Sequence, residues 1–174
     1  MSPIQTRRSS GRNDTLVSTD MLTHAVRAIL SRVTLDRTRD IPYLAGYSRN
    51  GRTIYIDRHL PRSFMARGKR VSVDRFLILH EAVEKSLLDQ LGLRYQHAHQ
   101  IALRAEEAAI RAAGVSWRDY DRFMQGFIKE AGDETLERLP LDLDIKPYRD
   151  EHDTDELRRM LKAMQRERSR RDRR

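Results

Sequence analysis

The sequence predicts a mostly helical α+β fold, in which a small β-hairpin or sheet packs on a helical core with a central antiparallel helix pair. Three observations lead to this prediction. Residues 74–91 and 96–113 carry apolar side chains at helical spacing and are joined by a short link. Residues 43–57 contain strand-favouring runs on both sides of Asn50-Gly51, a pair typical of tight turns. A length of 174 residues suffices for one modest hydrophobic core.

Capping residues and apolar spacing place the other elements. A helix is expected to begin near Ser18 or Asp20, where side-chain oxygens precede an apolar pattern. The hairpin alone would be marginal in water, so it must pack on the helices or gain another strand. We also expect a loop around Pro61 and Gly68, helices over residues 116–132 and 153–166, and an extended surface segment over residues 136–148.

The formal net charge of +8 is concentrated at the two ends of the chain. Residues 158–174 and 1–12 carry more than the whole excess of arginine and lysine, which leaves the middle slightly acidic. We therefore predict a disordered basic N-terminal tail over residues 1–17 and a single metal-binding domain over residues 18–150. A charged helix and an Arg-rich tail should occupy residues 151–174. Such ends either stay solvated or make weak, nonspecific contacts with nucleic acid or acidic surfaces.

Cysteine content and hydropathy restrict the compartment and the chemistry. The chain has no cysteine, so disulfides and thiolate metal sites are excluded and any metal must be held by histidine and carboxylate. Its apolar runs fall short of the roughly 20 residues that cross a bilayer, and the first residues lack the apolar run of a signal peptide. We expect a soluble, cytoplasmic protein without membrane contacts.

Ionisable residues lie on the apolar face of the first central helix. His80 falls at the centre of the stripe that passes through Phe76 and Leu87, and Glu84 lies one turn further on within the same stripe. Glu81 lies at the margin of the stripe and is expected to be half exposed. An ionised carboxylate on a buried face is costly unless a cation or several donors hold it.

The second central helix repeats this pattern. His99 and Glu106 share a face with small alanines, whereas His97 points to the opposite side. Folding the two helices antiparallel about position 93 sets His80 opposite Glu106 and brings Glu84 within a turn of His99. Four polar groups therefore converge in an otherwise apolar seam.

Two imidazoles and two carboxylates in one seam suit Zn²⁺, with Fe²⁺ and Mn²⁺ also compatible. The predicted ligands are His80, Glu84, His99 and Glu106, and Glu81 is the predicted general base that acts on a metal-bound water. The alternative is a metal-free network, His80 with Glu106 and His99 with Glu84, which only fixes the register of the helices.

These motifs resemble a minimal zincin of the gluzincin type. A strand over residues 53–57 precedes a helix with His80-Glu81-x-x-Glu84, and a further helix carries polar candidates. The chain is also similar to phage and bacterial proteins that share a Tyr-Ile-Asp-Arg-x-Leu-Pro segment, a His-Glu-x-x-Glu-Lys helix and an Ala-His helix. The resemblance covers residues 43–115.

The resemblance implies His80 and Glu84 as ligands, His99 or Glu106 as the third ligand, and Glu81 as the catalytic base. In zincins an edge strand over the metal helix holds an extended peptide. The sequence departs from the family at Glu84, where zincins have a second histidine, so the charge of the ligand set differs.

Three functions follow from these features. The first is a metal-dependent, peptidase-like hydrolase whose peptide or protein substrate pairs with the strand at residues 52–57. The second is a phage-type, nucleic-acid-associated binding protein that uses residues 166–174 to contact phosphates. The third is a catalytically silent zincin-like scaffold, in which the metal or its hydrogen-bonded substitute serves only stability.

Overall fold

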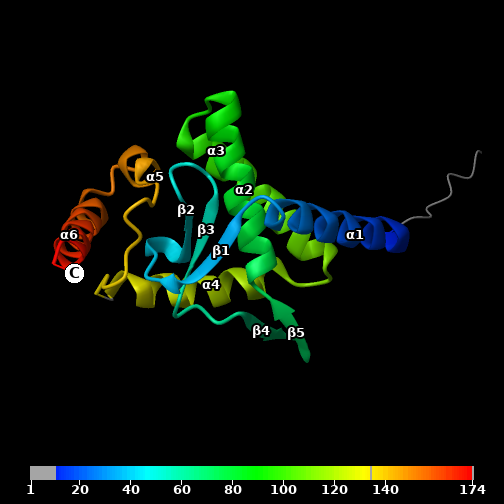
Figure 1. Cartoon of the computed structure of the whole chain (residues 1–174). Helices are drawn as coiled ribbons and strands as arrows, with labels where there is room; N and C mark the ends of the chain where they lie inside the picture. The colour runs from blue at the N-terminus through cyan, green and yellow to red at the C-terminus, as the bar shows by residue number, and fades with distance from the viewer. Residues whose placement is uncertain (1–10, 134, 174) are drawn as a thin grey trace, which may run out of the picture.

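The computed structural model describes residues 11–133 and 135–173 and confirms a mixed α+β fold with small sheets packed against helices (Figure 1). The helices of this described part are α1 (Gly11–Leu30), α2 (Asp74–Leu91), α3 (Tyr95–Ala112), α4 (Trp117–Asp133), α5 (Lys146–Asp150) and α6 (Thr154–Arg171). The strands are β1 (Thr34–Arg39), β2 (Ala45–Tyr47), β3 (Thr53–Asp57), β4 (Ser63–Ala66) and β5 (Lys69–Ser72), with a 3-10 turn, η1 (Pro42–Leu44), before β2.

The predicted hairpin is confirmed as β2 and β3, which pair antiparallel. Gly51 in the connecting turn has φ 67°, a conformation that glycine adopts without strain. The extra strand that the hairpin required is β1, which pairs parallel with β3. The strand order is β1-β3-β2, so β3 is central and β2 lies at an edge. The prediction that a substrate pairs with the strand at residues 52–57 is therefore wrong, because β3 already has a neighbouring strand on each side.

The loop expected around Pro61 and Gly68 is instead a second small sheet. β4 and β5 pair antiparallel, with Ser63 opposite Ser72 and Ala66 opposite Lys69. Gly68 has φ 77° in the tight turn between them. The hairpin was missed because its strands are only four residues long, and the basic, largely exposed side chains of β5 give no clear apolar alternation.

The ends of the described chain are more helical than predicted. α1 already begins at Gly11, so only residues 1–10 of the expected N-terminal tail remain, and these lie outside the described residues. α6 extends to Arg171, which places most of the expected Arg-rich tail in a helix. The Asp153 side chain caps this helix by accepting a hydrogen bond from the Glu156 backbone N–H.

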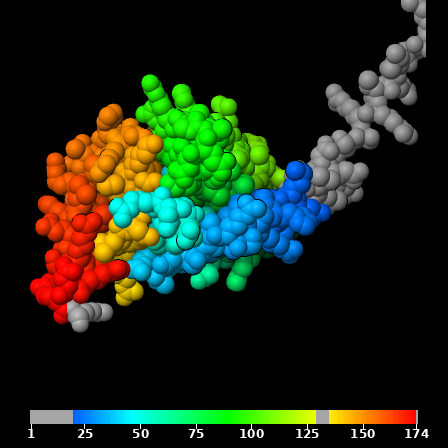
Figure 2. Space-filling view, turned by 45° about the horizontal axis from the view of Figure 1, so that its top comes forward, coloured from blue at the N-terminus to red at the C-terminus, as the bar shows by residue number. Residues whose placement is uncertain are grey.

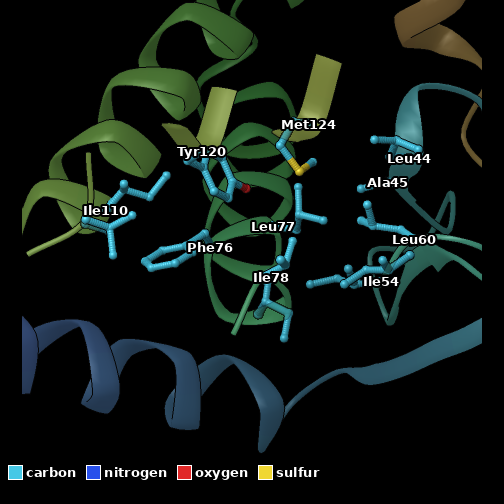
Figure 3. Close-up of a cluster of buried hydrophobic side chains, with 14 of the residues drawn as sticks. Leu44, Ala45, Ile54, Leu60, Phe76, Leu77, Ile78, Ile110, Tyr120 and Met124 are labelled. Atoms are coloured by element: carbon cyan, nitrogen blue, oxygen red, sulfur yellow. The ribbon is translucent and has the colours of Figure 1, made fainter. Parts of the chain in front are cut away.

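The main hydrophobic core surrounds α2. Figure 3 shows Phe76, Leu77 and Ile78 on this helix facing residues of α3, α4 and the three-stranded sheet, with α1 passing below. Tyr120 of α4 lies against Phe76 with a ring centroid distance of 5.7 Å. The site-bearing helix is thus held on several sides. No helix in the described ranges is long and apolar enough to cross a membrane.

The C-terminal segment packs on the other side of the sheet and forms a second core. In Figure 2 it covers one end of the body, in orange and red. Met160 is fully buried in this core, together with Tyr55 of β3. Asp40 accepts hydrogen bonds from the backbone N–H groups of residues 137 and 138, both at 2.6 Å. The Tyr148 hydroxyl donates to the Pro42 carbonyl at 3.0 Å. Asp40 and Pro42, which lie far from this segment in the sequence, therefore hold residues 137–148 in place.

Candidate metal centre

The two helices that carry the site form the predicted antiparallel hairpin. Gly92 ends α2 with φ 60°, the left-handed conformation typical of a helix C-terminus. Ala98 and Ala102 are fully buried on α3, and these small side chains let the two helices approach closely. His97 is exposed, as the helical phase predicts. The seam therefore has the geometry needed to bring its polar side chains together.

Three of the predicted residues form a cluster that can hold a metal ion. His80, Glu84 and His99 each offer a ligand atom, and these atoms all lie within 4.8 Å of one another. His80 Nε2 lies 3.3 Å from His99 Nδ1 and 3.6 Å from Glu84 Oε2. His99 Nδ1 lies 2.9 Å from Glu84 Oε2. His80 and Glu84 are buried, whereas the side chain of His99 is 36% exposed.

Glu106, the fourth predicted ligand, lies behind His80 rather than in the three-residue cluster. Its Oε2 is 2.8 Å from His80 Nδ1, the ring nitrogen that does not face Glu84. Its Oε1 accepts a hydrogen bond from the Tyr120 hydroxyl at 2.5 Å. A carboxylate on the second nitrogen of a ligating histidine fixes the tautomer and the ring orientation. The structure thus gives Glu106 the position of a residue that orients His80.

Glu81 is buried, in contrast to the predicted half exposure. It is 7% exposed and lines the same cavity as the cluster. Residues 144–153 also line this cavity and cover Glu81. The helical phase of α2 cannot reveal contacts with a segment so far along the chain. The Glu81 carboxylate makes no hydrogen bond with any described residue. Burial, reinforced by repulsion from the Glu84 carboxylate, raises the pKa of Glu81 to about 8.

The pKa values of His80 and Glu84 are shifted in opposite directions. Burial alone would lower the pKa of His80, but its contacts with Glu106 and Glu84 raise it to about 10. Burial alone would raise the pKa of Glu84, but its contacts with His80 and His99 lower it to about 2. Without a metal the seam therefore holds an imidazolium between carboxylates, and a metal ion would have to displace the proton of His80.

Two tyrosines at the site were not predicted. The Tyr47 hydroxyl donates a hydrogen bond to Glu84 Oε1 at 2.9 Å. The Tyr95 ring stacks on His99 with a centroid distance of 5.5 Å. Tyr95 lies one helical turn before His99, so its spacing could have revealed it. Tyr47 comes from β2 and carries no local signal.

The cluster and Glu81 line a groove with a volume of about 660 Å³. Its lining residues come from η1, β2, α2, α3, α4 and the segment around α5. Because β2 is an edge strand, part of the wall lies at the margin of the sheet. The cluster is therefore reachable by a molecule that enters the groove.

The chain matches no family model, and searches of curated proteins and of solved structures also found no match. The likeness to zincins therefore stays a prediction from the sequence motifs.

Proposed function

We propose that this protein is a metal-dependent, peptidase-like hydrolase. His80, Glu84 and His99 would hold the ion, and Glu81 would act as the general base. The observation that carries the proposal is the ligand cluster beside Glu81, a buried carboxylate without a hydrogen-bonding partner, in a groove open to solvent. Zn²⁺ is the ion that best suits two imidazoles and a carboxylate, and Fe²⁺ or Mn²⁺ also fit these donors.

The residues divide the chemistry between them. Three protein ligands leave a coordination position open for water or substrate, as in catalytic zinc sites. A bound ion would act as a Lewis acid and lower the pKa of water in that position. Glu81 would accept the proton of the attacking water in its ionised form, which its pKa of about 8 in the metal-free protein places on the alkaline side of neutral pH. Glu106 holds the His80 ring in the ligating orientation.

Metal analysis of protein purified without a histidine tag tests the ligand set. We expect about one Zn²⁺ per chain and loss of the ion in His80→Ala and His99→Ala, because each variant removes a ligand. His97→Ala is the matched control, since His97 lies on the same helix but is exposed. Full metal occupancy in a variant that lacks both His80 and His99 would reject the site.

Peptide hydrolysis tests the catalytic role of Glu81. In a mixed pool of quenched fluorescent peptides, we expect metal-loaded wild type to cleave and Glu81→Gln to lose at least about 100-fold in rate, because the general base is gone. Glu81→Gln should still bind the metal. Equal cleavage by both proteins would assign the base to another residue. A melting temperature that falls on chelation, with no cleavage of any peptide, would instead favour the silent scaffold.

Nucleic-acid contact through α6 is a second candidate function, supported by a row of exposed basic side chains. Arg158, Lys162 and Arg166 are exposed and spaced four residues apart, so they share one face of the helix. If this face contacts phosphates, binding of duplex DNA should weaken steeply with salt. Replacing all three by glutamine should make the salt dependence shallower, and unchanged binding would reject this function.

A further inference from the structure

The groove that contains the candidate metal centre is acidic, although the whole chain carries a net charge of +8. Neither lysine nor arginine is among its lining residues. A field of one sign inside a cleft attracts ligands of the opposite charge. The seven carboxylates that line the groove are Glu81, Glu84, Glu106, Asp121, Asp144, Glu151 and Asp153.

Some of these carboxylates are already paired within the chain. Glu84 and Glu106 contact the two histidines. Asp144 accepts a hydrogen bond from the Lys85 ammonium at 3.0 Å. Asp153 accepts one from the Tyr43 hydroxyl and also caps α6. Glu84, Glu106 and Asp144 therefore contribute little free negative charge to a ligand, whereas the donors to Asp153 are neutral and leave its charge in place.

Four carboxylates have no cationic partner among the described residues: Glu81, Asp121, Glu151 and Asp153. Asp121 comes from α4 and Glu151 follows α5, so they approach the groove from different elements. Glu81 is buried beside the metal ligands and makes no hydrogen bond with a described residue. A carboxylate that lines the groove without a hydrogen bond can accept a donor or a cation there.

Aromatic rings line the same groove. Tyr43 and Tyr148 are stacked with a centroid distance of 5.7 Å, and Tyr43 is 50% exposed. Tyr95 also lines the cavity. The faces of aromatic rings attract ammonium and guanidinium groups, particularly where water is partly excluded. Aromatic and acidic side chains together match the two halves of a lysine or arginine side chain, an apolar stem and a cationic head.

We propose that the groove selects peptides that carry lysine or arginine, with Asp121 and Glu151 binding the cationic head. The substrate role rests on the proposed hydrolase function, whereas the binding preference does not need catalysis. An extended peptide can run along Ala45 and Gly46 of β2, which line the wall. The end of this edge is already covered by the chain itself, where the Tyr47 carbonyl accepts a hydrogen bond from the Asp144 N–H at 2.9 Å. Phosphorylated and acidic ligands are disfavoured by the same charges.

Peptide binding to the chelator-treated full chain tests this selectivity without catalysis. Two fluorescein-labelled peptides of equal length are compared by fluorescence anisotropy, one with lysine and arginine and the other with glutamate at the same positions. The cationic peptide should bind at least about tenfold more tightly, despite the positive net charge of the protein. The groove variant Asp121→Asn/Glu151→Gln should bind it roughly three- to tenfold more weakly than wild type.

The matched control is Asp119→Asn/Asp155→Asn, which changes the net charge equally at acidic residues outside the groove. It should bind the cationic peptide as wild type does. Equal loss of affinity in both double variants, equal affinity for the two peptides, or no binding of either would overturn the proposal. Cationic selectivity without cleavage by the metal-loaded protein would reject only the hydrolase function. Cleavage of both peptides at equal rates would reject only the selectivity.

Discussion

The α2–α3 seam and the helix α6 are both rich in ionisable residues, yet they use them in opposite ways. In the seam, His80 and Glu106 are buried and contact each other at 2.8 Å. On α6, the pair Arg158 and Asp155 has side chains that are 63% and 90% exposed. Water satisfies exposed charges at little cost, whereas a buried charge needs a partner or a ligand. Burial, rather than the amount of charge, therefore distinguishes the candidate site, and the basic end of the chain gives little indication of it.

Of the substitutions that test this difference between the seam and α6, Glu106→Gln should have the largest effect on metal affinity and stability. The neutral amide orients His80 less firmly, and we expect metal affinity to fall by about 10–100-fold. The metal-free protein should lose about 1–3 kcal/mol of unfolding free energy, because a buried hydrogen-bonding group is left poorly paired. Competition with a chelator and urea unfolding measure the two effects. Wild-type metal affinity in this variant would show that Glu106 does not act on the metal centre.

Glu81→Gln should stabilise the metal-free protein at alkaline pH, whereas Glu106→Gln should destabilise it. The pKa of Glu81 is raised from 4.5 to about 8, so the folded state keeps a proton that the unfolded chain releases between these values. This group's contribution to stability therefore falls as the pH rises from about 4.5 to 8. Urea unfolding with a chelator should show the variant gaining roughly 1–3 kcal/mol over wild type between pH 5 and pH 8. A difference between the two proteins that does not change with pH would contradict the raised pKa.

Tyr120→Phe should have a smaller effect on the same seam. It removes the hydroxyl that donates to Glu106 and keeps the ring that packs on Phe76. We expect a loss of about 1 kcal/mol in the free energy of unfolding. Phe123→Leu, on the same helix, would show the effect of changing packing without touching Glu106. A Tyr120→Phe variant as stable as wild type would show that solvent replaces this hydrogen bond.

Glu167→Gln on α6 should have the smallest effect and provides the counterpart of Glu106→Gln. Glu167 accepts a hydrogen bond from Arg171 at 3.4 Å, one turn further along the exposed face. Exposed pairs of this kind contribute less than about 0.5 kcal/mol. Thermal unfolding should therefore be nearly unchanged. A loss as large as that of Glu106→Gln would contradict the distinction between the two regions.

The fold class and the helix hairpin could be predicted because they depend on local periodicity. The phase of α2 and α3 also placed His80 beside Glu106 and Glu84 beside His99, and both contacts are confirmed. β1 was missed because a parallel strand depends on a partner elsewhere in the chain. Its residues also alternate only weakly between apolar and polar side chains.

The distinction between ligand and supporting residue could not be predicted. Helical phase assigns a side chain to a face, but not to one or the other nitrogen of an imidazole ring. Glu106 therefore joined the predicted ligands, although it contacts Nδ1 of His80. The burial of Glu81 was missed for a related reason. The wall around Tyr148 comes from a segment far along the chain, and no local pattern places it beside α2.

The hydrogen bonds that hold this wall have a consequence for how the protein is made. The hydrogen bond from Tyr148 to Pro42 joins residues 106 positions apart in the sequence. The hydrogen bonds that Asp40 accepts from the backbone of residues 137 and 138 span 97 and 98 positions. During synthesis His80, Glu84 and His99 emerge from the ribosome before Tyr148 does, so the ligand cluster is present in the nascent chain while the groove still lacks its last wall. Closing such long loops is slow compared with forming the α2–α3 hairpin. A metal ion that binds this cluster would therefore meet an open site early and a walled site later.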